Sequence, residues 1–360
     1  MISVVVPVFR NTTLVEYCLD HLIRRLPTDA EVIAVDDASG AETVEAIRAF
    51  PRVRLISHPA NRGNTAAYNT GAAAAQGDIL VFADSDILVG DTTLTDFADV
   101  LRDDTIGAAG ALLLYPQTLA IQHAGVAFDR WILSHVYVGQ PYDPRRFAPV
   151  EERQAVTAAL FACRRATFER VGGFDETYRD GLEDIEFCLR CRELGLRNVI
   201  STRSPSLHLE SATRGPFKHI RRVYNYVIFF SRWHGRFEVD LPRFIVRAAT
   251  EMAWPWTNGT AATVVNFCTT PNWPDLIEAL LPLLDVVATH NLSGSVAESD
   301  AIDLYRQLPI AFHRDPLPLL FIVDHIEQVA RNRHWFDQRP CIDLIVDRHA
   351  NFLVSKGCAK

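Results

Sequence analysis

The sequence has no apolar run of the about 18–20 residues that a membrane-spanning helix requires. Its start lacks the positively charged region of a signal peptide, and Met1–Pro7 has the β-branched character of a strand instead. The 7 cysteines are scattered, and the single C-x-x-C pair, Cys188 and Cys191, has no second pair with which to complete a zinc site. We therefore expect reduced thiols, a cytoplasmic protein and at most peripheral membrane association.

Positive charge is also scarce. The 36 Lys and Arg residues are outnumbered by 44 Asp and Glu residues, which leaves a net charge of -8. This balance argues against a general nucleic-acid-binding protein, so we expect no nucleic-acid partner. The chain has neither internal repeats nor low-complexity segments. Its 360 residues, 48% hydrophobic and 22% charged, have the composition of a globular protein and the length for two domains.

Strand and helix patterns alternate over residues 1–104. Runs typical of buried strands cover residues 2–9, 31–37, 53–57 and 79–83. Segments with helical spacing lie between them, at residues 13–26, 41–50 and 65–75. This alternation predicts an α/β fold of the Rossmann-like kind, with a mostly parallel sheet and helices on both faces. Ligands of such sheets bind at the carboxyl ends of the strands.

The pattern changes further along the chain. Residues 107–150 have shorter apolar runs, which suit further strands and an irregular region. We place a domain boundary between residues 240 and 241, because the strand alternation stops there. Residues 241–360 are expected to form a smaller α-helical domain of unknown role, with helices at 273–288 and 318–331.

Two aspartates, Asp84 and Asp86, follow the fourth expected strand with Ser85 between them. Carboxylate oxygens are the ligands that hard divalent cations prefer, and such a cation neutralises the charge of a diphosphate. An isolated D-x-D also occurs in solvated turns. Its position after a buried strand favours the metal and diphosphate site.

A second acidic pair, Asp36 and Asp37, ends the second expected strand. An aspartate there can accept hydrogen bonds from a nucleobase imide or a ribose hydroxyl, although turn chemistry with Ser39 as a helix N-cap explains the same residues. The segment 61–64, Asn-Arg-Gly-Asn, provides turn geometry and close backbone approach, and Arg62 can reach a phosphate.

A third acidic pair, Glu183 and Asp184, opens an expected helix. The helix dipole favours a deprotonated carboxylate at this position, which is the form that a general base needs. A charge preference of helix starts is the alternative. Two further candidates, His208 and Arg214, follow a later strand: imidazole is a suitable third ligand for Mn²⁺-like ions, and a guanidinium can hold phosphate bidentately. A lone histidine is more often structural.

In their order and spacing these blocks resemble the family 2 glycosyltransferases of the GT-A fold. The residues that carry the resemblance are Val4–Asn11, Val35–Ser39, Asn61–Asn64, Asn69–Gly71, Asp84–Asp86, Gly172–Asp175, Glu183–Asp184 and His208–Ser211. The resemblance covers residues 1–235. Residues 121–125 and 174–194 also look like the bacterial branch that builds O-antigen and related surface glycans.

The resemblance implies an inverting, metal-dependent transferase that moves a hexosyl or deoxyhexosyl group from a nucleoside-diphosphate sugar to an acceptor hydroxyl. Asp184 would be the general base, with Glu183 beside it, and Asp84, Asp86 and His208 would bind Mn²⁺ or Mg²⁺. The residues implied for nucleotide-sugar binding are Pro7, Phe9, Asp36, Asp37, Ser39, Asn61, Arg62, Asn64, Asp84, Ser85 and Arg214. The acceptor (a glycan, a lipid-linked sugar or a peptide) is left open, and the helical tail could serve a protein partner.

Two other functions would use similar residues. A nucleotidyltransferase also combines a doubly wound sheet with paired aspartates, but it favours a glycine-rich loop after the first strand, and Pro7–Asn11 contains no glycine. A non-catalytic sugar-nucleotide-binding protein would need the same pocket without needing every carboxylate. Hydrolysis of the sugar donor would indicate an enzyme rather than a non-catalytic binding protein. Release of pyrophosphate from a nucleoside triphosphate would indicate a nucleotidyltransferase.

Overall fold

The computed structural model describes residues 1–128, 133–179, 181–209, 218–247, 260–269, 284–293, 302–308, 312, 317–325, 327–330, 332, 335–336, 339, 343–347 and 352–354. The chain divides into two compact units. The first comprises Met1–Trp131 and Tyr142–Glu238, and the second comprises Ile132–Pro141 and Val239–Lys360. The sequence pattern placed the main boundary at 240/241, and the structural division falls between Glu238 and Val239.

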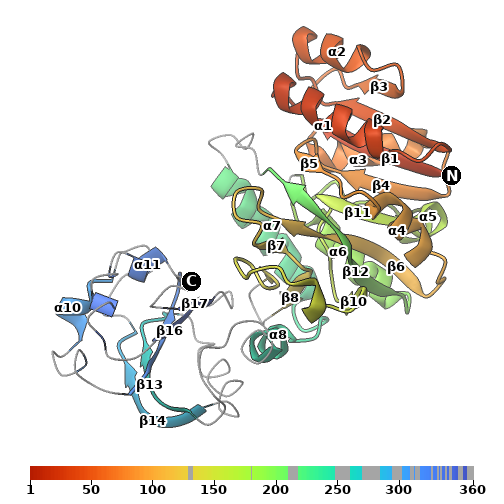
Figure 1. Ribbon diagram of the computed structural model, residues 1–360. Coiled ribbons are helices and arrows are strands. Elements are labelled where there is room, and N and C mark those ends of the chain that lie inside the picture. Colours follow the sequence, from red (N-terminus) through yellow and green to blue (C-terminus); the bar gives the residue numbers. More distant parts are fainter. Residues whose placement is uncertain are drawn as a thin grey trace. The chain divides into compact units, whose positions relative to one another are not determined.

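The first unit is built on a 10-stranded mixed sheet (Figure 1). Four parallel strands form one side of it, in the spatial order β4-β1-β2-β3. They are β1 (Ile2–Val8), β2 (Ala30–Asp36), β3 (Val53–Ser57) and β4 (Ile79–Ala83). All four were expected from the sequence, and their carboxyl ends lie along the same edge of the sheet.

The other strands of this sheet run in both directions. β6 (Ile106–Leu114) and β12 (Arg197–His208) are parallel, whereas β11 (Leu160–Arg164) is antiparallel to both β4 and β6. The shorter strands of this sheet are β5 (Ile87–Leu88), β7 (Ile121–His123) and β10 (Val150–Arg153). The strand β8 (Val126–Phe128) and η1 (Pro144–Arg146), a single 3₁₀ turn, are not part of it. Because β5 pairs with the end of β12, the segment after β4 lies beside residues more than a hundred positions later.

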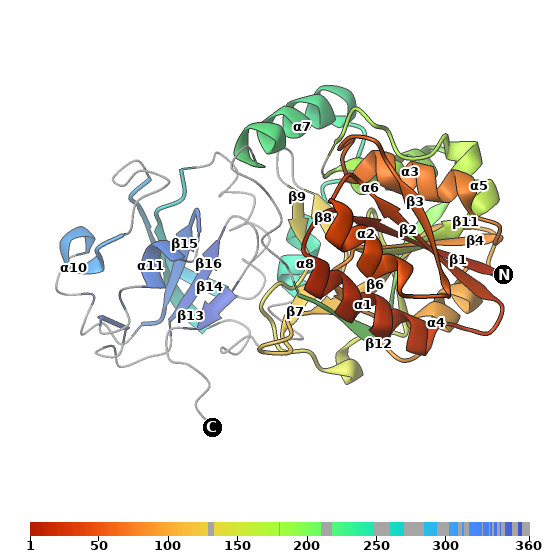
Figure 2. The same cartoon turned by 90° about the horizontal axis from the view of Figure 1, so that it is seen from above.

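Helices cover both faces of this sheet (Figure 2). One face carries α1 (Thr12–Arg25), α2 (Ala41–Arg48) and α4 (Thr93–Val100), and the other carries α3 (Asn64–Ala74), α5 (Arg165–Val171) and α6 (Glu183–Glu193). A longer helix, α7 (Lys218–Trp233), follows β12. The GT-A-like alternation predicted from residues 1–104 is therefore present.

Alternating side chains of β1 explain the two layers, because successive residues of a strand point to opposite faces. Val4 and Val6 belong to the same buried core as Val15 of α1. Val5 points the other way and approaches Gly71 of α3, where an added Cβ would lie 2.2 Å from the valine Cγ1. Glycine at this position therefore lets α3 pack directly on the strand that leads to the site.

The second unit contains a five-stranded sheet in the order β14-β13-β15-β16-β17. β13 (Thr260–Asn266), β14 (Leu284–Asn291), β15 (Leu319–Val323) and β16 (Leu344–Asp347) are parallel, and β17 (Phe352–Val354) is antiparallel to β16. The remaining described elements of this unit are β9 (Leu133–His135), α8 (Leu241–Arg247), α10 (Leu304–Gln307) and α11 (Glu327–Ala330).

The prediction of an α-helical domain at residues 241–360 is therefore wrong for the described residues. The helix expected at 318–331 begins as β15 and contains only the short α11, and the end of the one expected at 273–288 lies in β14; residues 273–283 are outside the described part. The buried strands of this sheet are short continuous apolar runs such as Leu319–Val323. Periodicity cannot distinguish such runs from one side of a buried helix.

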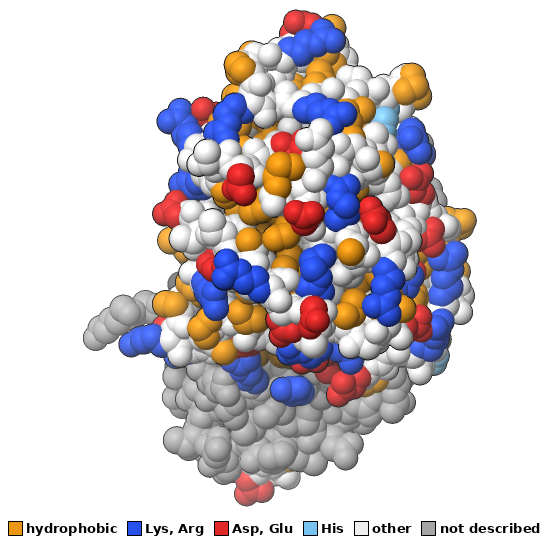
Figure 3. All heavy atoms as spheres, turned by 90° about the vertical axis from the view of Figure 1, so that its right-hand side faces the viewer, with side chains coloured by type: hydrophobic (Ala, Val, Ile, Leu, Met, Phe, Trp, Pro, Cys, Tyr) orange, Lys and Arg blue, Asp and Glu red, His pale blue; other side chains and the backbone are white. Residues whose placement is uncertain are grey.

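In the part of the chain that the structure describes, no helix combines the length and apolar character needed to cross a bilayer. The surface of the first unit in Figure 3 shows Lys and Arg side chains interspersed with Asp and Glu side chains rather than sorted by sign.

Candidate active site

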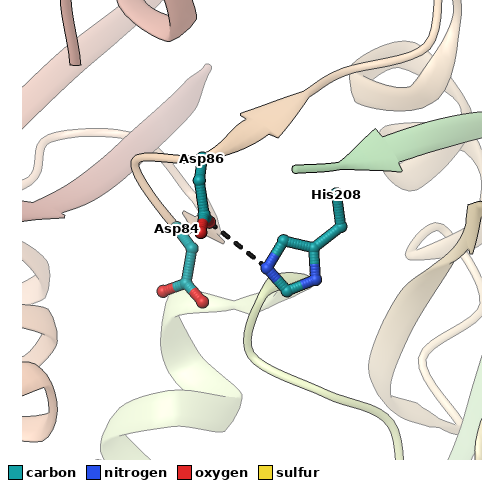
Figure 4. Close-up of side chains that lie close together, drawn as sticks. All are labelled: Asp84, Asp86 and His208. Atoms are coloured by element: carbon teal, nitrogen blue, oxygen red, sulfur yellow. Dashed lines mark ion pairs between the residues drawn. The ribbon is translucent and has the colours of Figure 1, made fainter. Parts of the chain in front are cut away.

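Asp84, Asp86 and His208 form a cluster of ligand atoms at the carboxyl end of β4. The carboxylate oxygens and an imidazole nitrogen all lie within 4.8 Å of one another. Figure 4 shows Asp86 and the His208 ring pointing toward each other, and Nε2 of His208 is 3.2 Å from Oδ1 of Asp86. The pairing of His208 with Ile87 explains the proximity, because it lays the end of β12 against β5. Two carboxylates and an imidazole are a donor set that fits a divalent cation such as Mn²⁺.

Gln122, on β7, orients the imidazole of His208. Its Oε1 lies 2.7 Å from Nδ1 of His208, and its Nε2 donates to the His208 carbonyl at 3.4 Å. Since an amide oxygen can only accept, Nδ1 carries the ring proton, and the lone pair of Nε2 faces the aspartates. The sequence reasoning missed this role of Gln122; the only signal for it was its place in the segment 121–125.

Asp84 is held by two side chains of α3. Tyr68, which is fully buried, donates from its hydroxyl to Oδ1 at 2.7 Å, and Asn64 donates to the same oxygen at 3.2 Å. Burial raises the pKa of Asp84, and the nearby charge of Asp86 raises it further. The Tyr68 hydroxyl also lies 3.0 Å from the carbonyl oxygen of Ala158.

Asp184 contacts the same residue, Ala158, through the backbone N–H of that residue. Its Oδ2 accepts from the Ala158 N–H at 2.8 Å, and its Oδ1 accepts from the Ile185 N–H at 2.8 Å. Burial raises the pKa of Asp184, while these bonds and one from the Thr157 side chain oppose that change. Ala158 thus contacts both the tyrosine that holds Asp84 and the carboxylate of Asp184, so the structure brings the metal cluster and the candidate base together.

Glu183 has a different environment from its neighbour. Its Oε2 accepts from the Gly181 N–H at 2.8 Å, across Leu182, which has a left-handed φ of 75°. Burial, followed by the charge of Asp184, raises the pKa of Glu183 well above its usual value. Glu183 therefore supports the strained turn from which α6 begins.

The segment before this turn is tied to α3 and α7. Asn69 forms two backbone hydrogen bonds with Phe174, donating to its carbonyl at 2.8 Å and accepting from its N–H at 3.0 Å. Thr65 donates to the Tyr178 carbonyl, and Asn225 of α7 donates to the Gly181 carbonyl at 2.8 Å. The stretch before Glu183 is thus held by α3 on one side and by α7 on the other. Asn69 and Phe174 belong to blocks that carry the family resemblance in the sequence, but the contact between them was not predicted.

Asp37 holds the segment 61–63 rather than facing an open pocket. Its two oxygens accept from the Arg62 and Gly63 N–H groups, each at 2.8 Å, and Oδ1 also lies 2.7 Å from Nδ1 of His58. Asn61 donates to the Asp37 carbonyl at 3.3 Å. Three of the roughly four lone-pair positions of the carboxylate are therefore occupied.

The remaining expected nucleotide-binding residues lie around the ends of β1 and β2. Asp36 accepts from the Ser39 N–H at 2.9 Å, which is the turn chemistry weighed as an alternative. Ser39 accepts from the Arg10 N–H at 2.8 Å, and the Arg10 guanidinium lies 4.8 Å from the ring centre of Phe9. Pro7 lies within β1 opposite a residue of β2. These side chains gather at one sheet edge.

Two of the expected residues, Arg62 and Ser85, are less buried than these. The Arg62 guanidinium is about half exposed and pairs with Glu176 at 3.2 Å. Ser85 is half-buried between the two aspartates. Arg214 lies outside the described residues, so its expected contact with phosphate stays a prediction.

Comparisons with known proteins agree with this geometry. Residues 3–148 match the sequence profile of Glycosyl transferase family 2. The chain is 28% identical over 228 residues to the O-antigen biosynthesis protein RfbC of Myxococcus xanthus, with 59% of this chain and 18% of that protein aligned. It is 31% identical over 206 residues to the pre-mycofactocin glycosyltransferase of Mycobacterium tuberculosis, with 54% of this chain and 40% of that protein aligned. The chain thus spans less than half the length of these relatives.

The crystal structure of GalNAc-T7 with UDP, GalNAc and Mn²⁺ is similar in fold, with a TM-score of 0.55 and 20% sequence identity over 71% of this chain and 53% of that one. This likeness supports the GT-A architecture. The sequence matches show that residues 3–148, within the N-terminal unit, are similar to the family 2 glycosyltransferases.

Proposed function

We propose that the protein is an inverting, metal-dependent glycosyltransferase that moves a sugar from a nucleoside-diphosphate sugar to an acceptor hydroxyl. The observation that carries this proposal is the shared position of Ala158. Its carbonyl oxygen lies 3.0 Å from the Tyr68 hydroxyl that holds Asp84 of the cation donor set, and its N–H donates to the buried carboxylate of Asp184, which is suited to accept a proton. GalNAc-T7, which is similar in fold, was solved with UDP, GalNAc and Mn²⁺, and this supports the nucleotide and cation part of the proposal.

Asp84, Asp86 and His208 would hold the cation, Mn²⁺ or Mg²⁺. When bound, such a cation neutralises negative charge on the diphosphate leaving group. The donor set needs both carboxylates oriented toward one point, which the hydrogen bonds from Tyr68 and Asn64 to Asp84 provide.

Asp184 would take the proton of the acceptor hydroxyl as that oxygen attacks the anomeric carbon. Its raised pKa suits this task, because a general base is most effective when its pKa lies nearer the working pH. A single displacement of this kind forms one C–O bond, breaks the bond to the diphosphate and inverts the anomeric centre. No covalent enzyme nucleophile is required.

Asp36, Asp37, Ser39 and the segment 61–64 would surround the nucleoside, with Pro7 and Phe9 beside them. The last lone-pair position of Asp37 could accept from a base imide or a ribose hydroxyl. Arg62, which is exposed, would change partner from Glu176 to a phosphate oxygen. Ser85 would lie near the diphosphate, as would Arg214.

The biological context that we propose is the synthesis of a bacterial surface glycan in the cytoplasm, with a hexosyl or deoxyhexosyl donor. A relative named for O-antigen biosynthesis supports this direction. The acceptor would be a glycan, a lipid-linked sugar or a peptide, and the second unit could bind the acceptor or a protein partner.

A panel of nucleotide sugars, screened by thermal shift with Mn²⁺, tests the proposal first, because a bound donor stabilises the native state. The donor that binds is then incubated with the protein and candidate acceptors, and the anomeric configuration of the product is read by NMR. A product of inverted configuration is expected. Donor binding without hydrolysis or transfer would instead favour a sugar-nucleotide-binding protein, and pyrophosphate release from a nucleoside triphosphate would favour a nucleotidyltransferase.

A further inference from the structure

The short strand β7 carries two polar residues that the proposed chemistry does not use. Gln122 and His123 follow one another, and both are buried, with 8% and 1% of their surface exposed. The pairing of β7 with β6 is irregular here: Ile121 pairs with Leu114 and His123 with Leu113, which leaves Gln122 as an extra residue. A bulge of this kind changes the direction in which side chains point and is frequent beside active sites.

Gln122 serves the metal cluster. Its Oε1 and Nε2 contact the ring Nδ1 and the carbonyl of His208, which fixes both the rotation of the imidazole and the nitrogen that carries its proton. Without this acceptor the ring could rotate or protonate on Nε2, and the donor set of Asp84, Asp86 and His208 would be incomplete.

His123 serves the candidate base. Its Nε2 accepts from the Thr157 N–H at 3.3 Å. The side chain of Thr157 hydrogen-bonds to Asp184, and the next residue, Ala158, donates its N–H to Asp184 at 2.8 Å. His123 thereby holds the two-residue segment that orients the Asp184 carboxylate.

We propose that Gln122 and His123 are positioning residues of this site: the bulge in β7 directs one toward the metal ligand His208 and the other toward the peptide that holds Asp184. The inference rests on the proposed function and explains the segment 121–125, whose sequence otherwise marks only a likeness to a bacterial branch. It predicts that substitution of Gln122 lowers Mn²⁺ affinity, whereas substitution of His123 lowers kcat.

Manganese binding to the full-length protein, measured by calorimetry with MnCl₂ alone, tests the first half. Gln122→Leu is expected to weaken Mn²⁺ affinity by roughly 10–100-fold, as loss of a ligand's outer partner does, and to recover turnover at high Mn²⁺. Gln122→Glu keeps an acceptor for Nδ1 and should bind Mn²⁺ like the wild type. The control is Gln154→Leu, because Gln154 is also buried and its hydrogen bonds with the described residues join it to Glu238 and Asn198.

Turnover at saturating Mn²⁺ tests the second half. His123→Leu should leave Mn²⁺ affinity unchanged and lower kcat by about 10–100-fold, since a misplaced catalytic group costs that much. His123→Gln, which restores an acceptor, should recover part of the loss. Gln154→Leu is again the control, because it removes a buried polar side chain that bonds to the backbone of Glu238.

Wild-type Mn²⁺ affinity in Gln122→Leu, or wild-type kcat in His123→Leu, would overturn the corresponding half. If a leucine variant does not fold, Gln122→Asn and His123→Phe remove the same contacts with smaller changes and are judged by the same outcomes. A wild-type protein that neither binds Mn²⁺ nor transfers sugar would contradict the proposed function itself. A wild type that does both, with variants that behave identically to it, would contradict only the inference.

Discussion

The proposed metal cluster and the proposed base are held in different ways. Asp84, Asp86 and His208 are half-buried, and side chains of Gln122, Tyr68 and Asn64 bond to them. The candidate base, Asp184, is buried and is held mainly by backbone N–H groups. The first arrangement leaves ligand atoms available to an ion, and the second fixes one carboxylate in one orientation. We call Asp84, Asp86 and His208 the open half of the site, because a bound ion would complete it. We call Asp184 the closed half, because its hydrogen bonds fix the carboxylate before any ligand binds.

The largest effect should come from breaking the closed half. Asp184→Asn keeps the shape and one of the two oxygens that accept from the Ala158 and Ile185 N–H groups, but it removes the proton acceptor. We expect turnover to fall by about 10²–10⁴-fold, the usual contribution of a general base, with donor affinity close to that of the wild type. Both are measured with the donor identified by thermal shift. Normal turnover at saturating acceptor would show that another group takes the proton.

Breaking the open half should act through binding instead. Asp86→Ala removes one of three ligands, so nucleotide affinity measured with Mn²⁺ should fall by about 10–100-fold while affinity measured with EDTA stays unchanged. Asp91→Ala is the matched control, because Asp91 is an exposed aspartate that pairs with Arg25. Equal affinities with and without Mn²⁺ in the wild type would argue against the metal role.

Tyr68→Phe tests both halves of the site at once, because the Tyr68 hydroxyl contacts Asp84 and also the carbonyl of Ala158, whose N–H holds Asp184. Loss of the hydroxyl leaves Asp84 and the Ala158 carbonyl short of a donor, which costs about 1–3 kcal/mol of unfolding free energy for a buried group. The ring stays packed against Phe82 and Phe174, so the fold should persist. We expect both weaker Mn²⁺ binding and lower kcat.

Tyr178→Phe is the control for that variant, because Tyr178 is also fully buried and the charged groups near it are Arg232, Glu186 and Asp175 rather than Asp84. Calorimetry and urea unfolding of the two variants separate a general packing loss from the specific one. A Tyr68→Phe protein that loses stability but keeps both metal affinity and kcat would show that the hydroxyl is structural only.

The smallest effect concerns the pH dependence of stability. The pKa of Glu183 is raised by burial, so the folded protein binds this proton more tightly than the unfolded chain does. The stabilisation from a raised pKa is present at low pH and is lost as pH rises through the folded-state pKa. Glu183→Gln, which is always neutral, should therefore have a higher Tm than the wild type at pH 8, and the difference should shrink as pH falls. Thermal scans from pH 4 to pH 8 measure it; a constant difference would show that burial does not shift this pKa.

Much of the first unit was predictable because its signals are local. The runs at 2–9, 31–37 and 79–83 became β1, β2 and β4, and the aspartates after them lie where a parallel sheet binds ligands. The second unit was not predictable in this way: runs such as 319–323 are buried on both faces, so they carry no alternation that would distinguish strand from helix.

Sequence by itself determined the residue types at the strand ends and the family to which their order points. Only the tertiary structure decided how those residues are partnered: Asp37 is bound to the segment 61–63, Glu183 supports a turn, and Gln122 and Tyr68 enter the site from β7 and α3. The physical reason is distance along the chain. A contact such as His208 with Gln122 spans 86 residues and depends on the register of β12 against β5 and β6, which no local pattern encodes.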